Sequence, residues 1–203
     1  MRVHSYVVAR DFGFAPNPFH GYCTLATCKP VLRRIAEVGD LVIGTSSTKG
    51  GKAPCLVYAM KVSEKMGFEA YWRDERFEAK RPNLRGTKKQ AFGDNIYHHV
   101  AGGGGWCQED SHHSLATGAR NMANVENDTQ TDAVLVAEDF AYWGGEGPEV
   151  PPEFRDFDGH DLCTRRGHKN DFPPEMAAAL GTWFRELPDR GFIGEPKDWA
   201  RSA

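Results

Sequence analysis

The sequence lacks the features that direct a chain into or through a membrane. Its first residues, MRVHSYVVARDFG, contain no long apolar core and no cleavage site of small residues, so we expect no signal peptide. Other apolar runs extend over only a handful of residues, far fewer than the roughly 20 that cross a bilayer. We therefore expect a cytoplasmic protein with no membrane partner.

Cysteine is sparse, and its five positions are widely spaced: Cys23, Cys28, Cys55, Cys107 and Cys163. An odd number of cysteines in a cytoplasmic chain indicates free thiols. Cys23 and Cys28 lie near His20, but a four-ligand zinc site needs a second close pair, so we expect no metal. A nucleophilic cysteine would need a histidine brought to it by the fold. We expect packing roles, and the sequence leaves open whether Cys23, Cys28 or Cys107 is reactive.

The common nucleotide-binding and hydrolase motifs are also missing. The chain has no GxxxxGK[ST] loop, no GxGxxG after a strand and no GxSxG elbow, and the four glycines at 102–105 lack the lysine and the strand. A nucleoside triphosphate enzyme is not indicated, and we expect no cofactor.

The charge is balanced, with 25 Lys and Arg against 28 Asp and Glu. A net charge of −3 excludes wholesale phosphate neutralisation. The segment 76–89 nevertheless contains six Lys and Arg residues and a single acid, Glu78. We predict that it contacts the phosphates of a nucleic acid, the alternative being a solvated loop without a partner. Its cations are Arg76, Lys80, Arg81, Arg85, Lys88 and Lys89.

Glycine and proline are plentiful, at 22 and 12 residues, which favours short strands joined by turns. β-branched and apolar runs predict strands at 3–9, 41–45, 56–62, 95–100 and 133–140. Helices are predicted from about residue 30, around 68–72 and over 173–186, with a loop over 77–92 and a loop tip at 48–52. The expected class is α+β: a small, strongly bent sheet or a β-barrel with short helices and a C-terminal helix.

A polar and aromatic cluster occupies GDNIYHH and WCQEDSHHS. Imidazole, amide and carboxylate groups read the edges of a nucleobase, and aromatic rings stack on it. Adjacent histidines on a strand point to opposite faces, so each pair offers one ligand to a site. We predict a ligand pocket here, against the alternative of an exposed turn region. Its predicted members are Asp94, Asn95, Gln108 and His113 for the base edge and Tyr97 and Trp106 for stacking. Trp143, in the separate segment FAYWGGEGP, is predicted to stack at the same pocket, the alternative being a core aromatic.

Several blocks together resemble a known family. SYVVARDFGFAPNPF, GYCTLATCKP, VGDLVIGT, LVYAMKV, RPNLRG, GDNIYHH and YWGGEGP, in this order, look like the second of the nucleotide modification associated domain families. The likeness runs from Arg2 to Trp199. These proteins occur in bacteria and phages and are linked to DNA base modification by gene neighbourhood. The resemblance implies a modified nucleotide or DNA as partner, and other DNA-modification proteins as possible partners, but supplies no catalytic residues.

A looser likeness covers Ile35–Val62, where a helix leads into a Gly-Asp turn, a strand and a returning hairpin. This order is similar to the pseudouridine synthase and archaeosine transglycosylase (PUA), EVE and ASCH domains. The likeness implies a PUA-like or EVE-like barrel that binds RNA or modified DNA bases.

Taken as a whole, the sequence predicts one domain over residues 1–203, with a β-rich core to about 150 and a helical extension from about 151. We favour a protein that binds a modified base or nucleotide through the pocket and the basic loop. The alternative is an enzyme that modifies or removes a base, with Asp94, Asp110 or a histidine as general base. The sequence does not indicate the base or the oligomeric state.

Overall fold

The computed structural model describes residues 1–48, 52–100, 102–164 and 167–201. The chain divides into two compact units, and each is described here by itself. Unit 1 comprises Met1–Asp11, Ala36–Ser63 and Ala137–Ala203, and unit 2 comprises Phe12–Ile35 and Glu64–Val136. None of the helices in the described residues is long and apolar enough to cross a membrane. The expectation of one domain with an extension from about 151 stays a prediction, because a grouping by contacts does not test it.

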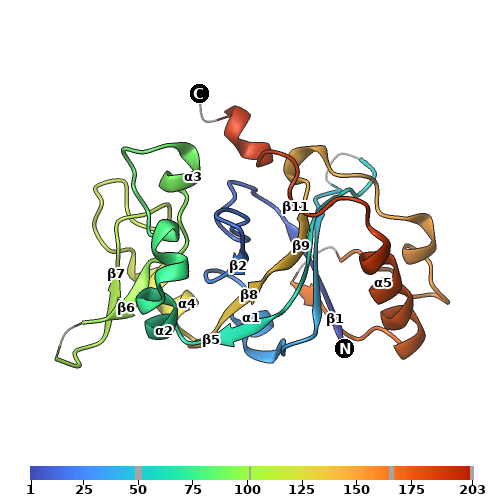
Figure 1. The fold of residues 1–203 in the computed structure, drawn as a ribbon, viewed down its shortest axis with the longest axis horizontal. Coiled ribbons are helices and arrows are strands. Elements are labelled where there is room, and N and C mark those ends of the chain that lie inside the picture. The colour runs from blue at the N-terminus through green and yellow to red at the C-terminus, as the bar shows by residue number, and fades with distance from the viewer. Residues whose placement is uncertain (49–51, 101, 165–166, 202–203) are drawn as a thin grey trace. The chain divides into compact units, whose positions relative to one another are not determined.

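Unit 1 is built on a mixed six-stranded sheet in the order β10-β1-β3-β4-β9-β11 (Figure 1). β1 and β3 are parallel, as are β9 and β11, and the other neighbours are antiparallel. The strands are β1 (Val3–Val8), β3 (Leu41–Ser46), β4 (Leu56–Lys61), β9 (Asp139–Tyr142), β10 (His168–Lys169) and β11 (Gly191–Phe192). The strands predicted at 41–45 and 56–62 are confirmed and form an antiparallel hairpin, and part of the predicted loop tip, 49–51, lies outside the described residues.

The core of unit 1 lies between this sheet and helix α5 (Pro174–Glu186). Met176, Leu180 and Phe184 recur at helical spacing and are buried in one cluster with Ile43 and other sheet residues. The predicted helix at 173–186 is therefore confirmed. Three 3-10 turns complete the unit: η2 (Gly144–Glu146), η3 (Pro152–Phe154) and η4 (Lys197–Arg201).

Unit 2 is built from smaller elements. A three-stranded sheet has the order β2-β8-β5, and β6 and β7 form a separate antiparallel hairpin. The strands are β2 (Cys23–Leu25), β5 (Glu64–Met66), β6 (Tyr97–His99), β7 (Trp106–Gln108) and β8 (Val134–Ala137). The helices are α1 (Pro30–Ile35), α2 (Phe68–Arg73), α3 (Lys88–Ala91) and α4 (Met122–Asp128), with the 3-10 turn η1 (Glu75–Lys80). Aromatic side chains from several of these elements form its core, among them Phe14, Phe68, Tyr71 and Phe77.

The α+β class is confirmed. Among the described residues the strands form open sheets, so the bent-sheet alternative applies and none of the sheets closes into a barrel. The strand predicted over 133–140 is wrong as a single element, since β8 and β9 join different sheets on either side of Glu138. The loop predicted over 77–92 contains most of η1 and all of α3, and α4 and β7 were not predicted. The PUA-like and EVE-like likeness stays a prediction.

Candidate active site

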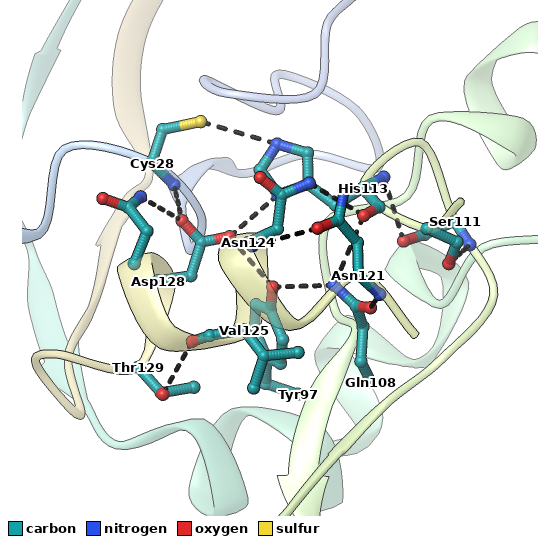
Figure 2. Close-up of polar contacts among 12 residues, drawn as sticks. Cys28, Tyr97, Gln108, Ser111, His113, Asn121, Asn124, Val125, Asp128 and Thr129 are labelled. Carbon is teal, nitrogen blue, oxygen red and sulfur yellow. Dashed lines mark hydrogen bonds and ion pairs between the residues drawn. The ribbon is translucent and has the colours of Figure 1, made fainter. Parts of the chain in front are cut away.

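A chain of side-chain contacts in unit 2 joins a cysteine, a histidine and an aspartate from three separate segments (Figure 2). Cys28 lies in the loop before α1, His113 in the loop after β7, and Asp128 is the last residue of α4. The sulfur of Cys28 lies 3.6 Å from Nε2 of His113. On the other side of the imidazole ring, Nδ1 lies 2.8 Å from Oδ2 of Asp128. This is the order of a nucleophile, a base and the group that orients the base.

Asp128 is fully buried, and both of its oxygens are held in place. Oδ1 accepts hydrogen bonds from the backbone N–H of Cys28, at 2.8 Å, and from the amide of Asn127, at 3.1 Å. Oδ2 accepts from the hydroxyl of Tyr97, at 3.0 Å, as well as from His113. Because the carboxylate binds the loop of Cys28 and the ring of His113 together, it fixes the two reactive groups relative to each other.

Further hydrogen bonds fix the support for this carboxylate (Figure 2). The amide of Gln108 donates to the Tyr97 hydroxyl at 3.0 Å, and its carbonyl accepts from the N–H of Asn121 at 2.8 Å. Asn121 is also the N-cap of α4, where its side chain accepts from a backbone N–H of the first turn. Asn124 donates to the carbonyl oxygen of His113 at 2.8 Å. The hairpin, α4 and the histidine loop are thus bound to one another.

The backbone around Cys28 has an uncommon conformation. Cys28 and Lys29 have φ angles of +57° and +43°, in the left-handed region that non-glycine residues seldom adopt. The buried guanidinium of Arg33 holds this turn by donating to the carbonyl oxygen of Cys28 at 2.8 Å and to that of Asp128 at 2.5 Å. Such conformations cost energy and concentrate at functional sites. The turn therefore supports a role for Cys28 beyond packing.

The electrostatics favour a charged histidine. Burial lowers the pKa of His113, but the hydrogen bonds to Asp128 and Cys28 outweigh it and raise the pKa to about 9. Burial raises the pKa of Asp128, and the bonds from His113 and from the N–H of Cys28 bring it below its ordinary value. At neutral pH the pair is an imidazolium beside a carboxylate. A cation next to a cysteine stabilises the thiolate, which is the nucleophilic form.

Aromatic rings lie beside this site. The ring of Phe14 is 4.6 Å from that of His113. The ring of His112 lies 4.7 Å from Phe12 and 5.1 Å from Phe92, and Phe12 stacks on Phe92 at 5.2 Å. Phe12 and Phe92 are partly exposed and His112 is exposed. Phe12, Phe92 and His112 therefore form a partly exposed aromatic cluster next to His113.

The ligand atoms of Cys28, His113 and Asp128 also lie within 4.8 Å of one another, close enough for a metal ion. The sulfur and the carboxylate, however, contact different nitrogens of the same ring. An ion bound at Nε2 beside the sulfur would leave Asp128 as the partner of Nδ1. This arrangement fits a nucleophile and base better than a shared set of three ligands.

The structure brings three of the predicted pocket residues into this network: Tyr97, Gln108 and His113. Trp106 lies on the same hairpin and stacks on His99 at 4.1 Å. Trp143 belongs to unit 1, where it is 8% exposed and part of the core cluster. Its role in ligand stacking stays a prediction.

Asp94 and Asn95 are buried inside unit 2 and bond to other residues of the unit, although Oδ1 of Asn95 has no hydrogen-bond partner among the described residues. The oxygens of Asp94, which is 1% exposed, accept from the Thr24 hydroxyl at 2.7 Å and the Tyr71 hydroxyl at 2.8 Å. The amide of Asn95 donates to the carbonyl oxygens of Tyr71 and Phe77. Reading the edge of a base would require these bonds to open, and the role stays a prediction.

The basic segment separates into two groups. Arg76 pairs with Glu64 and Asp74, and Arg81 pairs with Glu78 and lies 4.2 Å from the centre of the Trp72 ring. Lys80 is completely buried and donates to three oxygens of Asn17 and Tyr22. The remaining cations, Arg85, Lys88 and Lys89, are exposed on and near α3. Phosphate contact by this segment stays a prediction.

Sequence reasoning missed the role of two members of the site. Cys28 was assigned to packing, and Asp128 lies in the polar stretch NMANVENDTQ, which has no apolar periodicity. The available signal was the preference of Asn121 for a helix N-cap. It predicts a helix start but says nothing of what its last residue contacts.

The comparisons with known proteins decide the family. A family model described as nucleotide modification associated domain 2 matches residues 1–203. The chain belongs to this family. No curated protein and no solved structure matches it. The family description associates nucleotide modification associated domain 2 with the modification of nucleotides, and it assigns no catalytic residues or mechanism. The resemblance seen in the sequence is confirmed over the whole chain.

Proposed function

We propose that this domain is a cysteine-dependent enzyme that modifies or removes a nucleobase or a group attached to one. Cys28 is the nucleophile, His113 its acid–base partner and Asp128 the residue that orients the imidazole. The observation that carries the proposal is the contact order, sulfur to Nε2 at 3.6 Å and Nδ1 to carboxylate at 2.8 Å. The enzyme was the less favoured of the two functions derived from the sequence, and this contact order now favours it.

The chemistry follows from the order of the three side chains. The thiolate of Cys28 attacks an electrophilic carbon of the substrate, and a sulfur–carbon bond forms. The bond from this carbon to an oxygen or nitrogen of the leaving group breaks, its electron pair goes to that atom, and the atom takes the proton from Nε2 of His113 and leaves. The neutral imidazole then removes a proton from the water that attacks the same carbon, and the sulfur leaves as thiolate. His113 is protonated again and the cycle closes.

Two features support a nucleobase as the substrate class. Phe12, Phe92 and His112 form a partly exposed aromatic cluster next to His113, and aromatic side chains are what nucleobases stack on. The exposed cations of the α3 region supply positive charge for the phosphates of a nucleotide or an oligonucleotide. The family description points to the same class of substrate.

The test is mass spectrometry of modified deoxynucleosides, nucleotides and short oligonucleotides incubated with the protein. We expect a mass change in at least one compound and a covalent adduct that maps to Cys28. The Cys28→Ser variant should give neither result, whereas Cys55→Ser, a change in unit 1, should give both. Retention of a compound without turnover or adduct would support the binding module instead. Turnover by Cys28→Ser at the wild-type rate would reject the nucleophile.

A further inference from the structure

The β6–β7 hairpin presents different residues on its two faces. Its register pairs His98 with Cys107 and Tyr97 with Gln108. Side chains alternate along a strand and directly paired residues share a face, so Glu109, two residues after Cys107, lies on the side of His98 and Cys107. The opposite face carries Tyr97 and Gln108, which support Asp128. One face of the hairpin therefore supports Asp128 of the proposed active site. The other face brings together an imidazole, a thiol and a carboxylate.

The three groups are close enough to share an ion. Nε2 of His98 lies 2.8 Å from Oε1 of Glu109, and the sulfur of Cys107 lies 3.7 Å from the same oxygen. All three ligand atoms lie within 4.8 Å of one another. One nitrogen, one sulfur and one oxygen are donors that zinc accepts in tetrahedral sites. Each side chain is partly exposed, so an ion has access from solvent.

The ring of His98 is set for a metal at Nε2. Its Nδ1 lies 3.1 Å from the carbonyl oxygen of His99. A carbonyl oxygen only accepts hydrogen bonds, so Nδ1 carries a hydrogen, and Nε2, which faces Oε1 of Glu109, is the nitrogen that would bind the metal on losing its own hydrogen. Metal-binding histidines are commonly oriented by such a bond. Trp72 stacks on the ring at 4.3 Å, with 21° between the planes, and further limits its rotation.

We propose that His98, Cys107 and Glu109 bind a divalent transition-metal ion of the zinc type. Three protein ligands leave one position of a tetrahedron for water or another ligand. The ion would also join the two strands of the hairpin and so stiffen the support of Asp128. The three proposed ligands lie on or directly after the β6–β7 hairpin, so the metal site does not depend on whether Cys28 is a nucleophile. It replaces the expectation from the sequence that the chain binds no metal.

The experiment is a titration of chelator-treated protein with Zn²⁺ by calorimetry and with Co²⁺ by absorption. We expect one ion per chain and, for cobalt, the near-ultraviolet charge-transfer band of a bound thiolate. His98→Ala, Cys107→Ser and Glu109→Gln should each lower the affinity for zinc at least ~100-fold, beyond the ~10–100-fold that changes outside the ligand set cost. Cys107→His should bind zinc but give no thiolate band with cobalt.

Two controls separate this site from its surroundings. His99→Ala changes a residue on the other face of the hairpin and should leave the zinc affinity within about threefold of wild type. Cys28→Ser should do the same. Absence of zinc binding by folded wild-type protein would mean that His98 and Glu109 form only an ion pair, and would overturn the proposal. Loss of binding in Cys28→Ser with retention in Cys107→Ser would move the ion to the proposed active site. Circular dichroism of each variant establishes that it is folded.

Discussion

Unit 2 contains two polar networks built from similar residues, and they differ in what they leave accessible. The first joins Cys28, His113 and Asp128, and the second joins Asp94 with Thr24 and Tyr71. Cys28 and His113 are partly exposed, whereas every member of the second network is at most 1% exposed. The first has a sulfur and an imidazole within reach of solvent, the pair that we propose as nucleophile and base, and the second has its groups satisfied by one another.

The comparison shows that residue type does not assign a role. Asp94 was one of the predicted pocket residues, because it lies in a cluster of polar and aromatic residues. Burial raises its pKa, and its oxygens bind internal hydroxyls, as expected of a structural carboxyl. Asp128 is equally buried, but one of its partners is a histidine that also contacts a sulfur. The two aspartates therefore differ in their partners: the partner of Asp128 reaches a sulfur, and the partners of Asp94 are internal hydroxyls.

The largest effect is expected from Lys80, whose ammonium lies in the same interior as Asp94. Lys80→Met keeps the length of the side chain but removes a donor from three oxygens, of which the Asn17 carbonyl oxygen still has the N–H of Thr24. Each unpaired group costs about 1–3 kcal/mol, so unfolding free energy should fall by about 3–5 kcal/mol in urea titrations. Lys88→Met in exposed α3 is the control, with a change below about 0.5 kcal/mol. A Lys80→Met protein as stable as wild type would show that this interior is not a structural support.

The next effect separates the two networks by reactivity. His113→Gln removes the cation beside the Cys28 sulfur, so alkylation of Cys28 by iodoacetamide at pH 7 should slow by about 100-fold. Asp94→Asn should leave the rate within about twofold of wild type. Peptide mass spectrometry measures labelling of Cys28 against time. Equal slowing by both variants would mean that the two networks act as one.

The free energy of unfolding should fall with rising pH as His113 loses its proton. Its folded pKa of about 9 exceeds its ordinary value of 6.5. The stabilisation is therefore fully present below pH 6.5 and is lost as the pH rises to about 9, a fall of about 1–3 kcal/mol. Asp128→Asn should flatten this slope.

Lys80 should have the opposite effect at higher pH, where its titration makes the free energy of unfolding rise. Burial lowers its pKa to about 8, so its charged form is disfavoured in the folded state. Between about pH 8 and 10.5 the folded protein binds fewer protons than the unfolded chain, and Lys80 contributes a rise in stability. Denaturant titrations from pH 6 to 10.5 on wild type, Asp128→Asn and Lys80→Met resolve the two contributions. A wild-type curve without a fall between pH 6.5 and 9 would contradict the charged His113.

The smallest effect comes from a matched pair of hydroxyl deletions. Tyr97→Phe removes a hydrogen bond to Asp128, and Tyr71→Phe removes one to Asp94. Both should lower the unfolding free energy by about 1–2 kcal/mol. Only Tyr97→Phe should also slow alkylation of Cys28, by several-fold, because its partner orients His113. A slower reaction in Tyr71→Phe alone would reverse the assignment of the two networks.

The sequence by itself determined much of the fold and the family. The β-branched run of β1 and the helical spacing of Met176, Leu180 and Phe184 in α5 were sufficient, because these signals are local. The expectation of free thiols is confirmed for all five cysteines. The single strand predicted over 133–140 was wrong because an apolar run does not show where its pairing partner changes. Helix α4 was missed because its sequence is polar, and burial of Val125 and Asp128 supplies what propensity does not.

Only the tertiary structure decided which side chains act together. Cys28 lies 85 residues from His113 in sequence, and its backbone N–H donates a hydrogen bond to the carboxylate of Asp128, 100 residues away. No local pattern encodes such a pairing, because it depends on loops that converge after the hairpin and α4 have packed. The same holds for His98 and Cys107, which become neighbours through the strand register. The sequence supplied the residue types, and chain topology brought them within bonding distance.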